Sequence, residues 1–191
     1  RVQVYFLEDE KWFKPLTNLL YKSKNGRILA DNGERYAYFS KAVLSTLPHL
    51  FWVPDIFVCN GWQSALIPNY YKNEYEGISE FYKKIKTVLV VHDQDDYSQV
   101  DRAELVNMGI EIDPKIKGSK LNIYDVASYS ADAIVVMNRP GEKISTKLLK
   151  RSAFKDNKHK ITIFDQTDAE DIDYNAMTES LEQVILDITS K

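Results

Sequence analysis

The stretch KTVLVVHD, at residues 86–93, decides the fold of this 191-residue chain. It is the longest unbroken run of aliphatic and β-branched residues in the sequence. A run of this kind is typical of a parallel strand that is buried on both faces of a sheet. The stretch therefore predicts the central strand of an α/β domain.

Strand-like and helix-like patterns alternate outward from this stretch. They predict further strands at residues 2–7, 55–59, 133–137 and 160–164, and a polar loop at 14–32. They predict helices at 34–47, 62–76, 140–152 and 174–188, with helical character at 99–108 and 122–130. Pro68 either kinks the second of these helices or lies in its first turns.

Alternating strands and helices imply a parallel sheet with right-handed crossovers. The expected fold class is α/β, a three-layer sandwich around a Rossmann-like parallel sheet. In that sheet, residues 55–59, 86–92 and 133–137 are expected to lie side by side.

Composition excludes several classes of protein. The chain has 25 basic and 28 acidic residues, for a net charge of −3, so we expect no nucleic-acid partner and no anionic membrane partner. The only cysteine, Cys59, excludes an internal disulfide, and its apolar surroundings predict a buried, inert thiol. We therefore expect a cytoplasmic protein.

Three blocks of sequence carry a resemblance to a known family. They are VYFLED at 4–9 with DNGERYAYFSKAVL at 31–44, WVPDIFVCNGWQSALIPNYYK at 52–72, and KTVLVVHD at 86–93 with YSADAIVVM at 129–137. In order and spacing they resemble the starch synthase catalytic domain, the N-terminal lobe of bacterial glycogen synthases and plant starch synthases. The resemblance covers nearly the whole chain, so residues 1–191 are expected to form one such lobe, with no second lobe in this chain.

The resemblance implies a function. Members of the family have two Rossmann-like lobes and transfer glucose from ADP-glucose to an α-1,4-glucan, with retention. The N-terminal lobe supplies the acceptor side of the cleft. The implied partners are an α-glucan, a nucleotide sugar, and a second lobe or a full-length synthase. ADP-glucose would be a substrate, and no cofactor is expected.

The sequence also departs from the family pattern. The family's Cys-His-Asp-Trp motif is Cys-Asn-Gly-Trp at residues 59–62, so Gly61 replaces the acidic residue. The family's His-Asn pair is His92 and Asp93. The family's Lys-x-Gly-Gly-Leu loop does not occur, and the helix at 174–188 with its polar tail resembles a natural C-terminus. We therefore expect the chain to be inactive alone; the alternative is a non-catalytic homologue that binds glucan or regulates a true synthase.

The candidate site residues follow three predicted strands at their carboxyl ends, where ligands gather in open α/β sheets. His92 is the candidate catalytic residue, because the family's histidine contacts the sugar near the reacting centre. The alternative is a histidine hydrogen-bonded within a loop. Asn60, Gly61, Asp93 and Asn138 are the candidate substrate-binding residues. Gly61 permits a tight strand-to-helix turn and supplies no side-chain chemistry.

Other chemistries lack support in the sequence. Asp93, Asp95 and Asp96 form an acidic loop without the glycine and glutamate of a calcium site, so no metal is expected. No glycine-rich phosphate loop or dinucleotide fingerprint occurs among the 7 glycines.

Four tyrosines between residues 70 and 82 allow two interpretations. Exposed rings could stack on a glucan, whereas amphipathic tyrosines could pack at the rim of the core; we favour packing. The four are Tyr70, Tyr71, Tyr75 and Tyr82.

Overall fold

The computed structural model of the chain describes residues 2–13, 20–166 and 173–190. Its main sheet contains β1 (Ile56–Asn60), β2 (Lys86–Val91), β5 (Ala133–Asn138) and β6 (Ile161–Asp165). The strands lie in the order β1-β2-β5-β6, and every neighbouring pair is parallel. The predicted side-by-side arrangement of the first three strands is confirmed.

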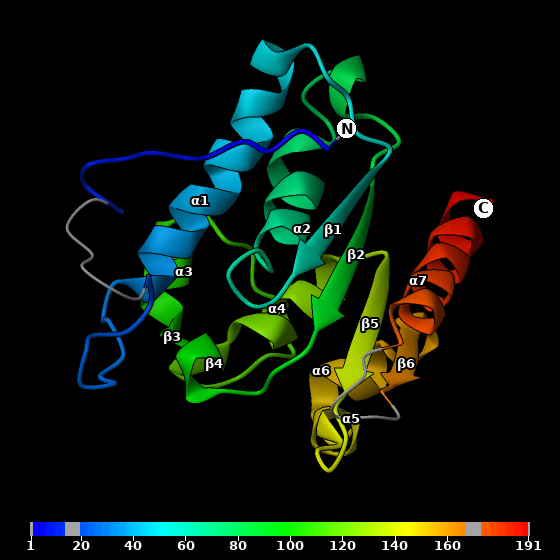
Figure 1. Cartoon of the computed structure of the whole chain (residues 1–191). Coiled ribbons are helices and arrows are strands. Elements are labelled where there is room, and N and C mark those ends of the chain that lie inside the picture. The colour runs from blue at the N-terminus through cyan, green and yellow to red at the C-terminus, as the bar shows by residue number, and fades with distance from the viewer. Residues whose placement is uncertain (1, 14–19, 167–172, 191) are drawn as a thin grey trace.

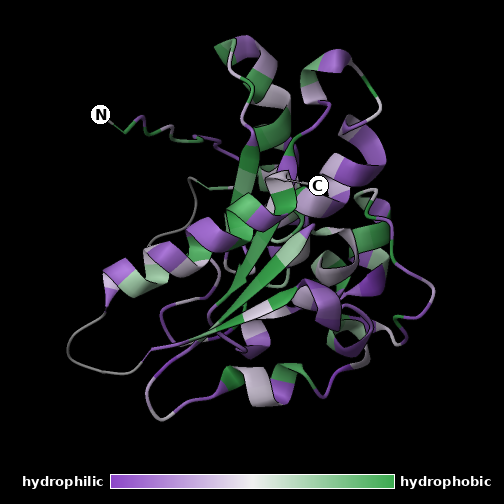
Figure 2. Ribbon diagram, turned by 90° about the vertical axis from the view of Figure 1, so that its right-hand side faces the viewer, coloured by the Kyte–Doolittle hydropathy of each residue, from purple (hydrophilic) through white to green (hydrophobic). Residues whose placement is uncertain are grey.

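Helices cover both faces of this sheet, which confirms the three-layer α/β fold (Figure 1). Alternate residues of each strand point to opposite faces. In β2, Leu89 and Val91 join the larger core with the helices of the first layer, whereas Val88 and Val90 face α7 (Tyr174–Thr189). Two-sided burial explains the unbroken apolar run. In Figure 2 the strands of the sheet are coloured largely green, which marks hydrophobic residues.

The first layer is built mostly from short helices around α1 (Asn32–Thr46). A small antiparallel sheet of β3 (Gln99–Asp101) and β4 (Lys120–Asn122) lies beside it. The remaining helices are α2 (Ile67–Tyr70), a π-helix (Tyr71–Tyr75), α3 (Arg102–Asn107), α4 (Ile123–Ser130), α5 (Ile144–Leu148) and α6 (Ser152–Asp156). Short 3₁₀ turns occupy Leu47–Leu50, Glu80–Tyr82, Asp96–Ser98 and Lys158–Lys160. No helix in the described ranges is long and apolar enough to cross a bilayer.

The second layer is α7, the one helix of the described residues that packs on this face of the sheet. Val184 packs on Val88 and Val135, and Leu181 and Ile185 extend the contact. The Asp173 side chain accepts a hydrogen bond from the Ala176 N–H at 2.9 Å, which caps the start of the helix. One helix cannot cover four strands: Val58 of β1, which alternates with the core residue Cys59 and so points to this face, is 45% exposed.

The predicted strand at residues 2–7 is wrong. These residues run without a regular element, and Val2 and Phe6 are 92% and 90% exposed. Their β-branched and aromatic composition favours a strand, but no described strand pairs with them. Without a partner, a strand's backbone groups gain nothing over their bonds to water.

The predicted helix at 62–76 is confirmed only in its second half. Turns occupy residues 62–66, and α2 begins at Ile67 with Pro68 in its first turn. Proline is tolerated there because the first N–H groups of a helix have no partner within it. Trp62 is buried and packs edge-on against Tyr36, with ring centroids 4.7 Å apart, as a core residue should.

The four tyrosines are packing residues. Tyr70, Tyr71 and Tyr82 are almost fully buried, and each hydroxyl donates to a backbone carbonyl at 2.7–2.9 Å. Tyr75 is partly buried, with its hydroxyl 2.6 Å from that of Ser45. The packing interpretation is therefore confirmed.

Candidate functional site

A cavity of about 450 Å³ lies between α7 and the carboxyl ends of the strands. Three candidate residues, Asn60, His92 and Asn138, line it from β1, from the end of β2 and from β5. Its walls are mainly apolar and include Val58, Met137, Phe164, Met177 and Leu181. We call it the carboxyl-edge cavity. A mostly apolar cavity with a few polar groups is typical of a small-molecule site.

His92 is held in place by a chain of polar contacts that leads into the core. Its Nδ1 lies 3.3 Å from Oδ2 of Asp93, and the two side chains are 33% and 18% exposed. Oδ1 of Asp93 accepts a hydrogen bond from the hydroxyl of Tyr124 at 3.1 Å. Tyr124 belongs to α4 and is fully buried, so its position is set by packing.

The surroundings of Asp93 shift the pKa of its carboxyl group. Burial raises the pKa of the Asp93 carboxyl above its ordinary value, while the charge of His92 and the hydrogen bond from Tyr124 act in the opposite direction. Burial and the neighbouring Asp93 charge both raise the pKa of Tyr124. Tyr124 therefore remains a neutral donor to Asp93. The hydrogen bond from Tyr124 holds the Asp93 carboxyl group in place, and this group contacts the imidazole of His92.

Gly61 lies beneath the imidazole of His92. Its backbone has a φ of +77°, and a Cβ built on it would stand 3.0 Å from His92 Nε2 and 3.0 Å from Gln63 Oε1. Its N–H donates to the Val90 carbonyl at 3.0 Å, which ties the end of β1 to β2. The predicted tight turn is present, and the space of a side chain at residue 61 is filled by its neighbours.

The two candidate asparagines differ. Asn60 is exposed at the mouth of the cavity. Asn138 is buried: its amide donates to Ser145 Oγ at 2.9 Å and Asp165 Oδ1 at 2.8 Å, and its Oδ1 accepts from the Ser145 N–H at 2.9 Å. All its amide hydrogens are therefore used within the protein. The structure brings Asn60, Gly61 and His92 together, with Asp93 behind them and Asn138 in the wall.

Sequence reasoning missed several residues of this cavity. Arg139 is exposed and follows Asn138 at the end of β5, so the rule that selected Asn138 also applies to it. Tyr174, Met177 and Ser180 come from α7, whose placement over these strands has no local sequence signal. Tyr124, which donates to Asp93 but does not line the cavity, was missed because a buried tyrosine in a helix is usually only a packing residue.

The described residues offer no group of three or more His, Cys, Asp or Glu side chains that could hold a metal ion. Cys59 is buried at 1% exposure, as predicted, and burial raises the pKa of its thiol to about 12. A thiol of this kind is a poor nucleophile at neutral pH. The polar chemistry of the carboxyl-edge cavity is therefore hydrogen bonding at His92, with Asn60 and Arg139 at its rim.

The family model of the starch synthase catalytic domain matches residues 1–184. The chain belongs to this family. Its starch synthase domain is 38% identical to the glycogen synthase of Clostridium perfringens over 135 residues, covering 69% of this chain and 27% of the relative. It is 33% identical to the glycogen synthase of Lachnospira eligens over 138 residues, covering 72% and 27%. The chain thus spans about a quarter of the length of these relatives.

A solved structure has the same fold. The catalytic domain of starch synthase IV from Arabidopsis thaliana, bound to ADP and acarbose, matches 76% of this starch synthase domain and 31% of its own chain. The TM-score is 0.59 and the sequence identity is 16%. This likeness confirms the α/β architecture with its parallel sheet.

Proposed function

We propose that this domain forms the acceptor side of a cleft that transfers glucose from ADP-glucose to an α-1,4-glucan, with His92 facing the reacting sugar. The placement of His92 carries the proposal. It follows the central strand at the edge where α/β sheets bind ligands, Asp93 contacts its ring, and Gly61 leaves room for the ring. Membership of the starch synthase family supports the substrate class.

The polar and apolar groups of the site suit the binding of a sugar. Asn60 and His92 offer hydrogen bonds to hydroxyls, and the apolar wall of Val58 and Met137 suits the C–H faces of a sugar ring. One lobe supplies few contacts, so we expect millimolar binding, which corresponds to about 4 kcal/mol.

The donor is proposed to be ADP-glucose, and no cofactor takes part. The Arabidopsis starch synthase IV structure, with ADP and acarbose bound, supports a nucleotide and a glucan as ligands. The second lobe of the cleft lies outside these 191 residues. Positioning and electrostatic stabilisation need both sides of a cleft, so the 191-residue chain alone should transfer no glucose.

Gly61 favours a second candidate function, a non-catalytic domain that binds glucan or regulates a synthase. The family's motif has an acidic residue at this position, and here its space is taken by His92 and Gln63. A carboxylate that helps to position the acceptor would be missing even if a second lobe were present. Supplying a full-length synthase separates the two functions: the acceptor-side lobe should gain transfer activity, whereas the regulator should only change the synthase's own rate.

The test has an activity arm and a binding arm. Incubated with radiolabelled ADP-glucose and glycogen, the purified chain should incorporate label only at the no-protein level; incorporation that disappears with His92→Ala would contradict this. In the binding arm, maltotetraose should shift the NMR signals of residues 60–63 and 91–93. His92→Ala should weaken these shifts, and His49→Ala, an exposed histidine outside the cavity, should not. No shifts at this edge at high sugar concentration would remove the site.

A further inference from the structure

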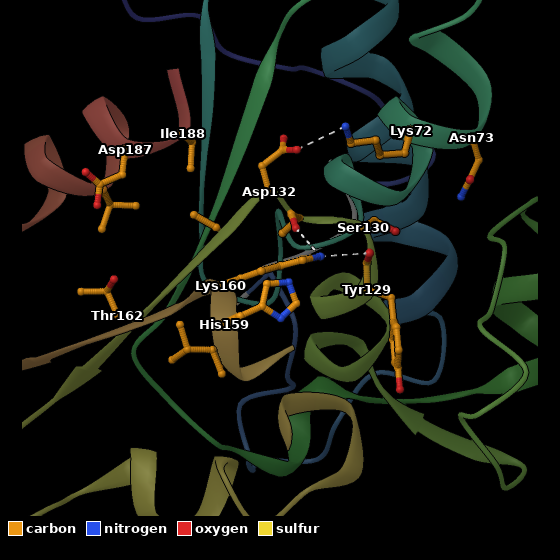
Figure 3. Close-up of a pocket in the computed structure, with 14 residues that line it drawn as sticks. Lys72, Asn73, Tyr129, Ser130, Asp132, His159, Lys160, Thr162, Asp187 and Ile188 are labelled. Atoms are coloured by element: carbon orange, nitrogen blue, oxygen red, sulfur yellow. Dashed lines mark hydrogen bonds and ion pairs between the residues drawn. The ribbon is translucent and has the colours of Figure 1, made fainter. Parts of the chain in front are cut away.

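A second cavity, of about 510 Å³, opens at the opposite, amino-terminal edge of the sheet (Figure 3). It lies where β5 and β6 begin, between the end of α4 and the last turns of α7. We call it the amino-edge cavity. It shares no lining residue with the carboxyl-edge cavity and plays no part in the proposed transfer site.

Asp132, in the wall of this cavity, is engaged by the protein itself. Its Oδ2 accepts hydrogen bonds from the N–H and the hydroxyl of Thr87 at 2.8 and 2.9 Å. Its Oδ1 lies 3.3 Å from Nζ of Lys72, which also lies 3.5 Å from Glu76. These contacts hold the start of β2 and leave Lys72 neutralised by two carboxylates.

Lys160, the other lysine of the lining, is held by backbone carbonyls instead of carboxylates. Its ammonium donates to the carbonyl of Ala131 at 3.0 Å and, weakly, to that of Tyr129 at 3.5 Å. An ammonium has three N–H groups, so the third is available to the cavity (Figure 3). Burial lowers the pKa of Lys160, the charge of Lys72 acts in the same direction, and Asp132 opposes both. A half-buried ammonium gains from an added acceptor.

The rest of the lining is balanced in charge. The lysines and carboxylates of the lining are equal in number, Lys72 and Lys160 against Asp132 and Asp187, with His159 beside them, so these four charges give no net charge that would select a free anion. Hydroxyl and amide groups of Ser130, Thr162 and Asn73 alternate with these charges, and Val184 and Ile188 form an apolar side. Sugar hydroxyls both donate and accept, and sugar rings have apolar C–H faces.

We propose that the amino-edge cavity is a second binding site, for a neutral polyhydroxy ligand of the sugar class, and that Lys160 anchors a hydroxyl oxygen of this ligand. Thr162, at the start of β6, supplies a second hydrogen bond. The inference rests on the cavity's own donors, acceptors and charge balance, and it stands whether or not the carboxyl-edge site binds glucan.

The test is an NMR titration of the whole chain with maltose in one arm and inorganic phosphate in the other. Maltose should shift the amide signals of residues 130–133 and 160–162. Lys160→Met keeps the aliphatic stem and should weaken this binding about tenfold, the loss of one charge-assisted hydrogen bond. Lys158→Met, an exposed lysine of the same turn that does not line the cavity, should bind like the parent.

Lys160 also holds the carbonyls that end α4, so Lys160→Met can lower stability. Thr162→Val is therefore the second variant: it removes a hydroxyl with little change of volume, and it too should weaken binding. Response to phosphate without response to maltose would overturn the proposal, as would no shifts at this edge or equal affinity in all variants. His92→Ala should leave this edge unaffected, which separates the outcome from that of the carboxyl-edge site.

Discussion

His92 lies directly over Gly61, with Nε2 3.0 Å from the position that a Cβ of residue 61 would occupy. Gly61 also has a φ of +77°, which favours glycine. The two residues are therefore interdependent: the histidine can approach the turn after β1 only because residue 61 has no side chain. An acidic residue here would have to adopt a strained backbone and displace His92 or Gln63.

Gly61→Ala should destabilise the domain more than Gly141→Ala does. Both glycines have a φ of +77°, so both variants place a side chain in the left-handed region, at a cost of about 1–2 kcal/mol. A Cβ on Gly141 meets nothing within 4 Å, whereas one on Gly61 contacts His92 and Gln63. Urea denaturation measures the difference in stability between the two variants. In a His92→Ala background this difference should be smaller. Equal losses of unfolding free energy in the two alanine variants would show that the His92 ring moves aside without cost.

Asp93→Asn should change how stability depends on pH. Because burial raises the folded pKa of Asp93, the folded protein binds this proton more tightly than the unfolded chain does. The resulting stabilisation is complete below the ordinary pKa of 3.8 and is lost as the pH rises through the folded pKa. Relative to Asp93→Asn, the parent should therefore lose stability as the pH is raised from acid towards neutral.

Urea denaturation at a series of pH values gives this comparison for Asp93. Asp96→Asn, an exposed neighbour in the same loop, is the matched control and should follow the parent. If the parent and Asp93→Asn run parallel across the whole pH range, the carboxyl of Asp93 is not desolvated in solution.

Glu104→Ala should cost about 1 kcal/mol of stability, the usual loss for a helix cap. Glu104 belongs to α3, yet its carboxylate accepts the N–H of Glu34 in the first turn of α1 at 2.9 Å. It also lies against Gly33, where a Cβ would stand 2.6 Å from its carboxyl carbon. Glu104→Gln keeps an acceptor and should lose less. The control is Glu182→Ala, at an exposed position on α7. If thermal unfolding shows the same loss of stability for Glu182→Ala and Glu104→Ala, Glu104 does not cap α1.

Leu89→Ala should cost about 2–5 kcal/mol, because Leu89 is fully buried in the larger core and a cavity would remain. Val58→Ala should cost less than about 1 kcal/mol, since Val58 is 45% exposed at the uncovered side of β1. The pair tests the unequal covering of the two sheet faces. Comparable losses in guanidinium denaturation would mean that Val58 is covered in solution.

The strands of the sheet were predictable where two faces are buried. β2 and β5 are nearly continuous apolar runs of β-branched residues, which is typical of strands covered on both faces. Residues 2–7 have a similar composition and failed as a strand, because pairing depends on a partner that local sequence does not contain. The helix at 62–76 failed in its first turns, where Gly61 and the residues after it form a tight turn before Pro68.

The site was predictable to the extent that topology determines it. Asn60 ends β1 and His92 follows β2, so the parallel sheet brings them to one edge. Asn138 follows the same rule, but Ser145 and Asp165 occupy its amide, and nothing in the sequence marks those partners. The amino-edge cavity escaped prediction because Lys72, Lys160 and α7 meet there only through the tertiary fold.

The single helix over the second sheet face is the common wall of both cavities. Met177 and Leu181, in its first half, line the carboxyl-edge cavity, and Val184 and Ile188, in its second half, line the amino-edge cavity. A tilt of α7 about its middle would widen one cavity as it narrows the other.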